Sequence, residues 1–276
     1  MNYAGAPITS YARLREVVDA QMEADSCLPA GSIHSAREHG SVLLSSARLE
    51  LEQMATHRRI FRDHFELRLA NYRGLTLLCA QHPRVLEEIE ALLSGDGGNW
   101  MGDYSKLREI NNFLTPYALQ SSGTALYYTP SRTMVENPKT FQLPREFVLV
   151  HLAKDEWNAQ RASQNFTNAL GTSELRPDVL VSAIEHNGEV VAMAGASADS
   201  AMMYQIGIDV LPAYRSKGLG TALVAELSRR VLEAGKVPFY GTSPSHIQSQ
   251  VLAERAGYEP AWWEFVSSSL LEVTVD

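Results

Sequence analysis

Two glycines that precede a helical pattern constrain this chain more than any other feature. The stretch YRSKGLGTAL covers residues 214–223, and apolar residues at helical spacing extend from it to Leu232. The N-terminus of a helix offers backbone N–H groups without partners and the positive end of the helix dipole. Glycines at that point let an anion approach the backbone closely. The stretch therefore predicts a phosphate or pyrophosphate site at the start of a helix.

Two common phosphate loops fit this stretch poorly. A Walker A loop needs Gly-Lys followed by Ser or Thr, but Gly218 is followed by Leu219, Gly220 and Thr221. A dinucleotide-binding loop needs a third glycine where Leu223 stands, and it follows the first strand of a βαβ unit. The elements predicted before this loop are instead an antiparallel hairpin.

The elements predicted around the loop indicate a mixed sheet flanked by helices. The hairpin spans residues 179–197, and its turn contains Asn187 and Gly188, the strongest short signal for a hairpin turn. Further strands are predicted at residues 147–153, 201–210, 237–241, 261–266 and 270–275. Helices are predicted at residues 155–171, 221–235 and 245–257.

Residues 215–220, RSKGLG, resemble the (Q/R)xxGx(G/A) loop of the GNAT acyltransferases. The preceding VLPAY and the later AGY at residues 256–258 are also similar to that superfamily, and the resemblance covers about residues 147–266. It implies an α+β (mixed α/β) fold, whose GNAT domain has a central mixed, mostly antiparallel sheet. The chain is also similar to a bacterial subgroup with an extra N-terminal module, expected to be a mainly helical α/β domain.

The resemblance implies acetyl-CoA as cosubstrate and no metal. The pyrophosphate would lie on the backbone of residues 216–221, and the pantetheine arm would run beside the strand that ends at Val210. An amine would attack the thioester directly, which requires a base and often an acid for the departing thiolate. The residues expected to bind the cosubstrate are Ile208, Asp209, Val210, Arg215, Ser216, Lys217, Gly218, Leu219, Gly220, Thr221 and Ser249.

The catalytic residues depart from the family pattern. Many members carry a tyrosine as the acid where this chain has Ala253. Tyr204 stands where a base is often found, although a phenol with a pKa of about 10 is a poor base. His246 is a second candidate base, with a reference pKa of about 6.5, or a residue at an exposed helix start. Asp209 either contacts the substrate amine or forms a structural hydrogen bond.

The N-terminal module shows no chemical motif. We expect a boundary near residues 130–145, which gives domains at 1–140 and 141–276, with helices from residue 8 to about 72 and a strand at 74–80. Residues 74–128 also allow a degenerate half-copy of the acyltransferase fold. The basic run from His57 to His64 predicts a solvated helix face or, less favoured, a contact with an anion. Trp262 and Trp263 predict core packing rather than an acceptor pocket.

Charge and cysteine content limit the partners. The formal net charge of −8 makes nucleic acid and anionic membrane surfaces poor candidates. The two cysteines form no CxxC pair, which predicts neither a disulfide scaffold nor a thiolate metal site, and no leader or membrane span is evident. We expect a cytoplasmic protein; its oligomeric state stays open, with a homodimer as one option.

Three functions remain open at this stage. We favour a CoA-dependent N-acetyltransferase that acts on a small-molecule or peptide amine. The alternative is a GNAT-fold module that binds acyl-CoA as a sensor or interaction protein, because the acid and the base are unclear. A nicotinamide oxidoreductase fits the spacing of the loop least well.

Overall fold

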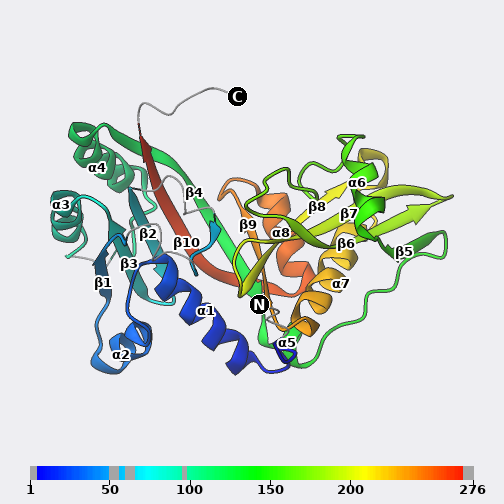
Figure 1. The fold of residues 1–276 in the computed structure, drawn as a ribbon, viewed down its shortest axis with the longest axis horizontal. Coiled ribbons are helices and arrows are strands. Elements are labelled where there is room, and N and C mark those ends of the chain that lie inside the picture. The colour runs from blue at the N-terminus through cyan, green and yellow to red at the C-terminus, as the bar shows by residue number, and fades with distance from the viewer. Residues whose placement is uncertain (1–4, 50–55, 60–65, 95–97, 270–276) are drawn as a thin grey trace. The chain divides into compact units, whose positions relative to one another are not determined.

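The computed structural model describes residues 5–49, 56–59, 66–94 and 98–269. The chain divides into two compact units (Figure 1). Unit 1 comprises Met1–Val18 and Tyr128–Pro260, and unit 2 comprises Asp19–Tyr127 and Ala261–Asp276. The sequence predicts a single boundary between residues 140 and 141, whereas the chain passes between the units three times. These crossings lie within helix α1 (Tyr11–Asp25) and strands β4 (Leu119–Pro130) and β10 (Tyr258–Ser269).

Unit 1 contains the mixed sheet that the sequence predicts. Its strands are β5 (Phe147–His151), β6 (Asp178–His186), β7 (Glu189–Ala198), β8 (Met203–Val210) and β9 (Val237–Thr242). They are ordered β9-β8-β7-β6-β5, and every neighbouring pair is antiparallel except β8 and β9. The predicted hairpin turn is confirmed, because Asn187 and Gly188 have φ angles of 54° and 80°.

Helices cover unit 1's sheet. They are α5 (Arg132–Glu136), α6 (Lys154–Arg161), α7 (Leu219–Glu233) and α8 (Ile247–Ala256), with a 3-10 turn η4 at Pro212–Tyr214. The apolar stripe of α7 is buried and packs against β6, β7 and β8. Trp157 of α6 and Phe166 pack with Val181 and Met193 in a separate cluster. The mixed α/β class is therefore confirmed for this part of the chain.

Unit 2 contains the other strands and its own helices. It contains α2 (Ser32–His39), β1 (Leu43–Ala47), β2 (Leu67–Tyr72), β3 (Leu75–Ala80), α3 (Pro83–Leu93), α4 (Tyr104–Leu114) and η3 (Thr115–Tyr117). The strand order is β1-β3-β2-β10-β4. β1 is parallel to β3, while β2 is antiparallel to both β3 and β10. The apolar faces of α3 and α4 close a core on this sheet with Leu67, Leu69 and Phe265.

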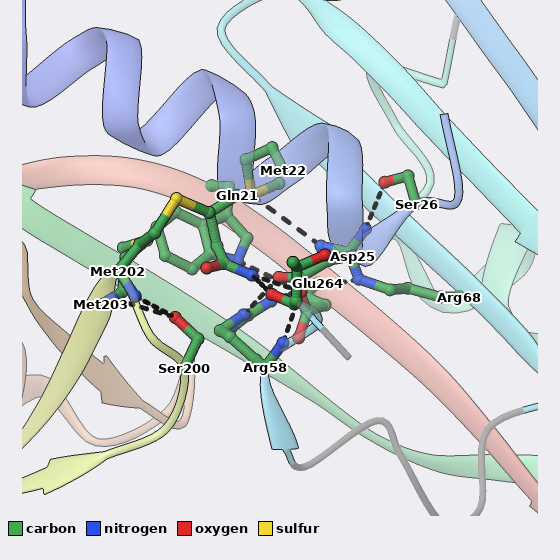
Figure 2. A network of polar contacts seen from close by, with 12 residues as sticks. Gln21, Met22, Asp25, Ser26, Arg58, Arg68, Ser200, Met202, Met203 and Glu264 are labelled. Carbon is green, nitrogen blue, oxygen red and sulfur yellow. Dashed lines mark hydrogen bonds and ion pairs between the residues drawn. The ribbon is translucent and has the colours of Figure 1, made fainter. Parts of the chain in front are cut away.

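Charged side chains lie at the centre of unit 2. Arg58 Nε donates to Asp25 Oδ2 at 2.5 Å, and Arg58 Nη2 donates to Glu264 Oε2 at 2.6 Å (Figure 2). Arg68 Nη2 donates to the same Glu264 oxygen at 2.7 Å, and all four residues are at most 3% exposed. Burial opposes ionisation of Asp25, but Arg58 and Arg68 hold its pKa below the usual value. Two cations thus balance two anions.

Several sequence-based expectations are wrong. Residues 43–47 and 67–72 are strands rather than helix, because they pair with β3 and β10, and tertiary pairing overrides a short helical pattern. Helix α6 ends at Arg161, so most of the predicted helix at 155–171 is a loop. His57 and Arg58 are buried rather than solvated. Trp262 is confirmed as a core residue, and the predicted strand at 270–275 lies outside the described residues.

Candidate functional site

The glycine loop leads directly into helix α7. Gly218 is the N-cap, with a φ of 81°, and Ser216 also has a positive φ, of 63°. The first hydrogen bond of the helix runs from Ala222 N to Gly218 O at 3.1 Å. Within the described residues, none of the backbone N–H groups of residues 216–221 donates a hydrogen bond. The loop therefore presents several donors, and the positive end of the helix dipole, to an anion.

Strands β8 and β9 separate beside this loop. They pair at Met203 with Val237 and at Tyr204 with Pro238, and the last pair is Gln205 with Phe239. β8 continues to Val210 and stays paired with β7 on its other edge. Residues 206–210 therefore have an edge that β9 does not cover. Such an edge can accept an extended ligand as an added strand.

Gly220 lets α7 approach β8 and α8 closely. A Cβ atom at this position would lie 2.9 Å from Leu252 Cδ1 and 3.4 Å from Val210 Cγ2. By contrast, a Cβ at Gly218 would meet nothing within 4 Å. One glycine of the motif is therefore needed for packing. The other is needed for its backbone conformation and for open space in front of the loop.

The candidate side chains on β8 divide between the two faces of the sheet. Successive strand residues alternate in direction, and Ile208 and Val210 face Gly220 of α7. Tyr204 has the same parity and lies on that face, whereas Asp209 lies on the other. Burial raises the pKa of Tyr204, so its phenol stays protonated at neutral pH. Tyr204 and Asp209 do not meet.

Asp209 holds a loop against the sheet. Its carboxylate accepts hydrogen bonds from Asn168 N at 2.7 Å, from Asn168 Nδ2 at 2.6 Å and from Ala169 N at 2.9 Å. The loop lies so close that a Cβ at Gly207 would be 1.8 Å from Asn168 O, and one at Gly195 would be 1.8 Å from Ala169 O. Sequence reasoning missed these residues, although glycine inside a strand is a signal of close backbone approach.

A cavity of about 590 Å³ adjoins this loop. It is lined by α6, by the loop after it and by β8 residues 205–207, and Gln205 is also the last β8 residue paired with β9. Arg161 and Asp178 in its wall form an ion pair. A larger cavity of about 740 Å³ lies along the later turns of α7, at Arg229 and Glu233, and does not include the glycine loop.

Tyr240 occupies the point where β8 and β9 separate. It is the first β9 residue after the last paired one, Phe239, and it is 5% exposed. Its hydroxyl lies 2.8 Å from Ser249 Oγ on α8. Burial raises the pKa of Tyr240 despite the hydrogen bond to Ser249. Sequence reasoning missed Tyr240 because no pattern marks a tyrosine in an apolar strand as functional.

The remaining candidates surround the loop. Arg215 Nε donates to Val210 O at 3.0 Å, and Lys217 Nζ lies 5.6 Å from the ring centroid of Tyr214. The Lys217 ammonium is therefore held over an aromatic face next to the loop. His246 precedes α8 with an exposed side chain that makes no capping hydrogen bond. Ala253, where relatives carry a tyrosine, is fully buried.

Within the described ranges, no group of three or more His, Cys, Asp or Glu side chains is placed to hold a metal ion. No helix in the described part of the chain combines the length and apolar character that crossing a membrane requires.

Comparison with known proteins identifies the region that contains the loop. The model of the acetyltransferase (GNAT) family matches residues 144–258. No curated protein matches the chain. The match therefore covers the sheet, the glycine loop and both helices α7 and α8.

Similar solved structures overlap only partly with this chain. A GCN5-related N-acetyltransferase-like protein from Streptococcus suis is 19% identical with a TM-score of 0.44, covering 69% of this chain and 77% of that chain. A GCN5-related N-acetyltransferase from Kribbella flavida is 18% identical with a TM-score of 0.43, covering 57% and 62%. A Salmonella typhimurium protein solved with its cofactor acetyl-CoA is 18% identical with a TM-score of 0.35, covering 48% and 98%. The assignment rests on the family model.

Proposed function

Residues 144–258 belong to the acetyltransferase (GNAT) family, and from that premise we propose that the protein transfers an acetyl group from acetyl-CoA to an amine. The amine belongs to a small molecule or a peptide. The observation that carries the proposal is the separation of β8 from β9 after Gln205, next to the free N–H groups of residues 216–221. One feature accepts an extended arm and the other a diphosphate.

The chain's own groups account for binding of the donor. The N–H groups of residues 216–221 hold the diphosphate, and Lys217 adds a positive charge beside them. The uncovered edge at residues 206–210 pairs with the amides of the pantetheine arm. Arg215 supports this edge, since it is hydrogen-bonded to Val210 O. The donor is thus bound largely by backbone, which explains why glycine spacing is the visible signal.

The transfer itself needs few side chains. The neutral amine attacks the thioester carbonyl, a C–N bond forms, and the nitrogen gives up a proton to the base. The C–S bond breaks, and the thiolate takes up a proton and leaves as coenzyme A. No bond to the protein forms at any step. A positioned acid that protonates the thiolate accelerates this step by roughly 10²–10⁴-fold.

We assign the acid to Tyr240. It stands where the strands part, its raised pKa keeps the phenol protonated at neutral pH, and Ser249 fixes the hydroxyl at 2.8 Å. It thereby takes the role that family members give to a tyrosine at the position of Ala253. Tyr204 is a poor base because its pKa is raised as well. The base is therefore His246 or water.

The acceptor binds in the cavity of about 590 Å³ beside Gln205. This assignment gives Asp209 a positioning role, because its carboxylate holds the loop that forms one wall of the cavity. We also propose a cytoplasmic location, since that compartment keeps most thiols, such as those of Cys27 and Cys79, in the reduced form.

Calorimetric titration with acetyl-CoA tests the donor site, using Gly218→Ala with Gly188→Ala as the matched control. Both glycines have φ near 80° and open space around the missing Cβ, so both variants carry the same backbone strain. We expect Gly218→Ala to weaken binding by about 10-fold or more, which is about 1.4 kcal/mol, and Gly188→Ala to bind like the parent protein. Equal affinities in all three would show that the loop is not the site.

Release of free thiol from acetyl-CoA, measured over a panel of amines, tests the reaction. We expect turnover with at least one amine. Tight binding of acetyl-CoA without turnover on any amine would favour the alternative, an acyl-CoA sensor or interaction protein.

A further inference from the structure

The only two cysteines of the chain meet in the core of unit 2. Cys27 follows the end of α1, and Cys79 lies on β3, far away in the sequence. Both are free thiols, 8% and 1% exposed, and Val266 packs against them. Their spacing in the sequence predicts no pair, so the fold alone creates this dithiol.

The two sulfur atoms have different surroundings. Leu49 N–H donates to Cys27 Sγ at 3.4 Å, and Nε2 of the buried His57 lies 3.3 Å from the same sulfur. The neighbouring Cys79, with a smaller contribution from His57, lowers the pKa of Cys27 to about 5 despite burial. The neighbouring Cys27, together with burial, raises the pKa of Cys79. Cys27 is therefore the sulfur that ionises more readily, and Cys79 is the one that keeps its proton.

The backbone at Cys27 adds an independent observation. Its φ is 55°, in the left-handed region that glycine usually occupies just after a helix. The turn is closed by a hydrogen bond from Leu28 N to Glu23 O at 2.9 Å. A cysteine thus stands where glycine fits best, and its side chain contacts β3 and His57.

We propose that Cys27 and Cys79 form a redox-active dithiol that hydrogen peroxide converts to an intramolecular disulfide. The Cys27 thiolate attacks one peroxide oxygen, the O–O bond breaks, and hydroxide leaves to give a sulfenic acid. The Cys79 thiol then attacks the Cys27 sulfur; the S–S bond forms, the S–O bond breaks, and water leaves with the thiol proton. The dithiol loses two electrons and the peroxide gains them. This site lies within unit 2 and does not depend on the function proposed for unit 1.

The test treats the full-length protein with a small excess of hydrogen peroxide and then with dithiothreitol. We expect both thiols to disappear in a titration of the denatured protein, and peptide mapping to find residues 27 and 79 in one disulfide-linked pair. Dithiothreitol should restore both thiols. Persistence of both thiols, or a disulfide between two chains, would overturn the proposal.

Single variants separate the roles of the two sulfurs. Cys79→Ser should stop at a Cys27 sulfenic acid that dimedone traps, whereas Cys27→Ser should leave Cys79 reduced. His57→Asn should slow the loss of thiols without changing the linked pair. Equal oxidation rates of the two single-cysteine variants would contradict the assignment of Cys27 as the attacking sulfur. The result for the parent protein stands even if a variant fails to fold.

Discussion

Unit 1 and unit 2 are both sheets covered by helices, but they place polar groups differently. Among the described residues, unit 1 leaves the backbone N–H groups of residues 216–221 without an acceptor, and β9 does not cover β8 beyond Gln205. Unit 2 buries Arg58 and Arg68 against the carboxylates of Asp25 and Glu264. Open donors suit a ligand, whereas closed ion pairs fix one arrangement of the chain. The comparison therefore contrasts a unit with the proposed donor site and a unit whose buried charges pair with one another.

Removing one buried cation should have the largest effect on the free energy of unfolding. Arg58→Met leaves Asp25 and Glu264 without one of their partners in the core, and should lower the free energy of unfolding by about 3–5 kcal/mol. Urea unfolding followed by tryptophan fluorescence measures the free energy of unfolding. Trp262 reports on this site, because its ring centroid lies 5.1 Å from Arg58 Cζ.

The control for this variant is Arg229→Met in unit 1. Arg229 also pairs with two carboxylates, Glu226 and Glu233, but its side chain is 45% exposed. Solvent screens such pairs, so we expect a loss of no more than about 1 kcal/mol. Equal losses in the two variants would remove the distinction between the units.

The next largest effect on stability should come from a steric clash with the loop at residues 168–169, which lies against unit 1's sheet. Gly207→Ala places a Cβ 1.8 Å from Asn168 O, and should cost about 1–3 kcal/mol of stability as the backbone shifts. We also expect a higher KM for the acceptor amine, because this loop lines the cavity. In Gly171→Ala, in the same loop, the nearest atom to the new Cβ is 3.8 Å away, and neither quantity should change.

Removing a single hydroxyl should affect activity more than stability. Tyr240→Phe loses the proposed acid, and kcat should fall by about 10²-fold with little change in KM for acetyl-CoA. Tyr258→Phe is the matched control, because its ring packs against that of Tyr240 with centroids 6.2 Å apart, while its buried hydroxyl lies 2.6 Å from Ser228 Oγ rather than Ser249 Oγ. If the two variants have the same kcat, Tyr240 is not the acid.

Changes in pH should have the smallest effects on stability. Unit 1 should lose stability as the pH rises, and unit 2 as the pH falls. Burial raises the pKa of Tyr204, Tyr240 and Tyr258 in unit 1, so stability present below about pH 10 should be lost as unfolded tyrosines ionise above it. The lowered pKa of Asp25 in unit 2 contributes stability that is lost as pH falls below about 4. Urea unfolding from below about pH 4 to above about pH 10, with Tyr258→Phe for comparison, measures the loss of stability at each end of the range. A loss at only one end would contradict the expected difference between the units.

The sequence predicts the fold well where local signals are strong. The Asn187-Gly188 turn, the helix that follows Gly218 and the strand beginning at Val237 are all found. It fails at β1 and β2, whose short apolar segments match a helical pattern and become strands only because β3 and β10 pair with them. Pairing between distant segments is not encoded in local periodicity.

The same limit applies to the sites. The loop that we propose to bind the donor through its backbone is visible in six consecutive residues, since glycine spacing sets its geometry. Tyr240 with Ser249, Asp209 with Asn168, and Cys27 with Cys79 are contacts made by the fold. Each partner alone is an ordinary residue of a strand, loop or helix. Sequence reasoning therefore offers Ser249 and Asp209 as candidates without the partners that define their roles.

The three crossings of the chain have a consequence for how this protein is made. Strand β10 pairs with β2, and its Glu264 is the carboxylate shared by Arg58 and Arg68. A nascent chain therefore carries both arginines long before the ribosome reaches the carboxylate that they share. Unit 1 needs the chain up to Pro260 and unit 2 needs the segment that starts at Ala261, so splitting the gene at residue 140 would separate segments that belong to the same unit.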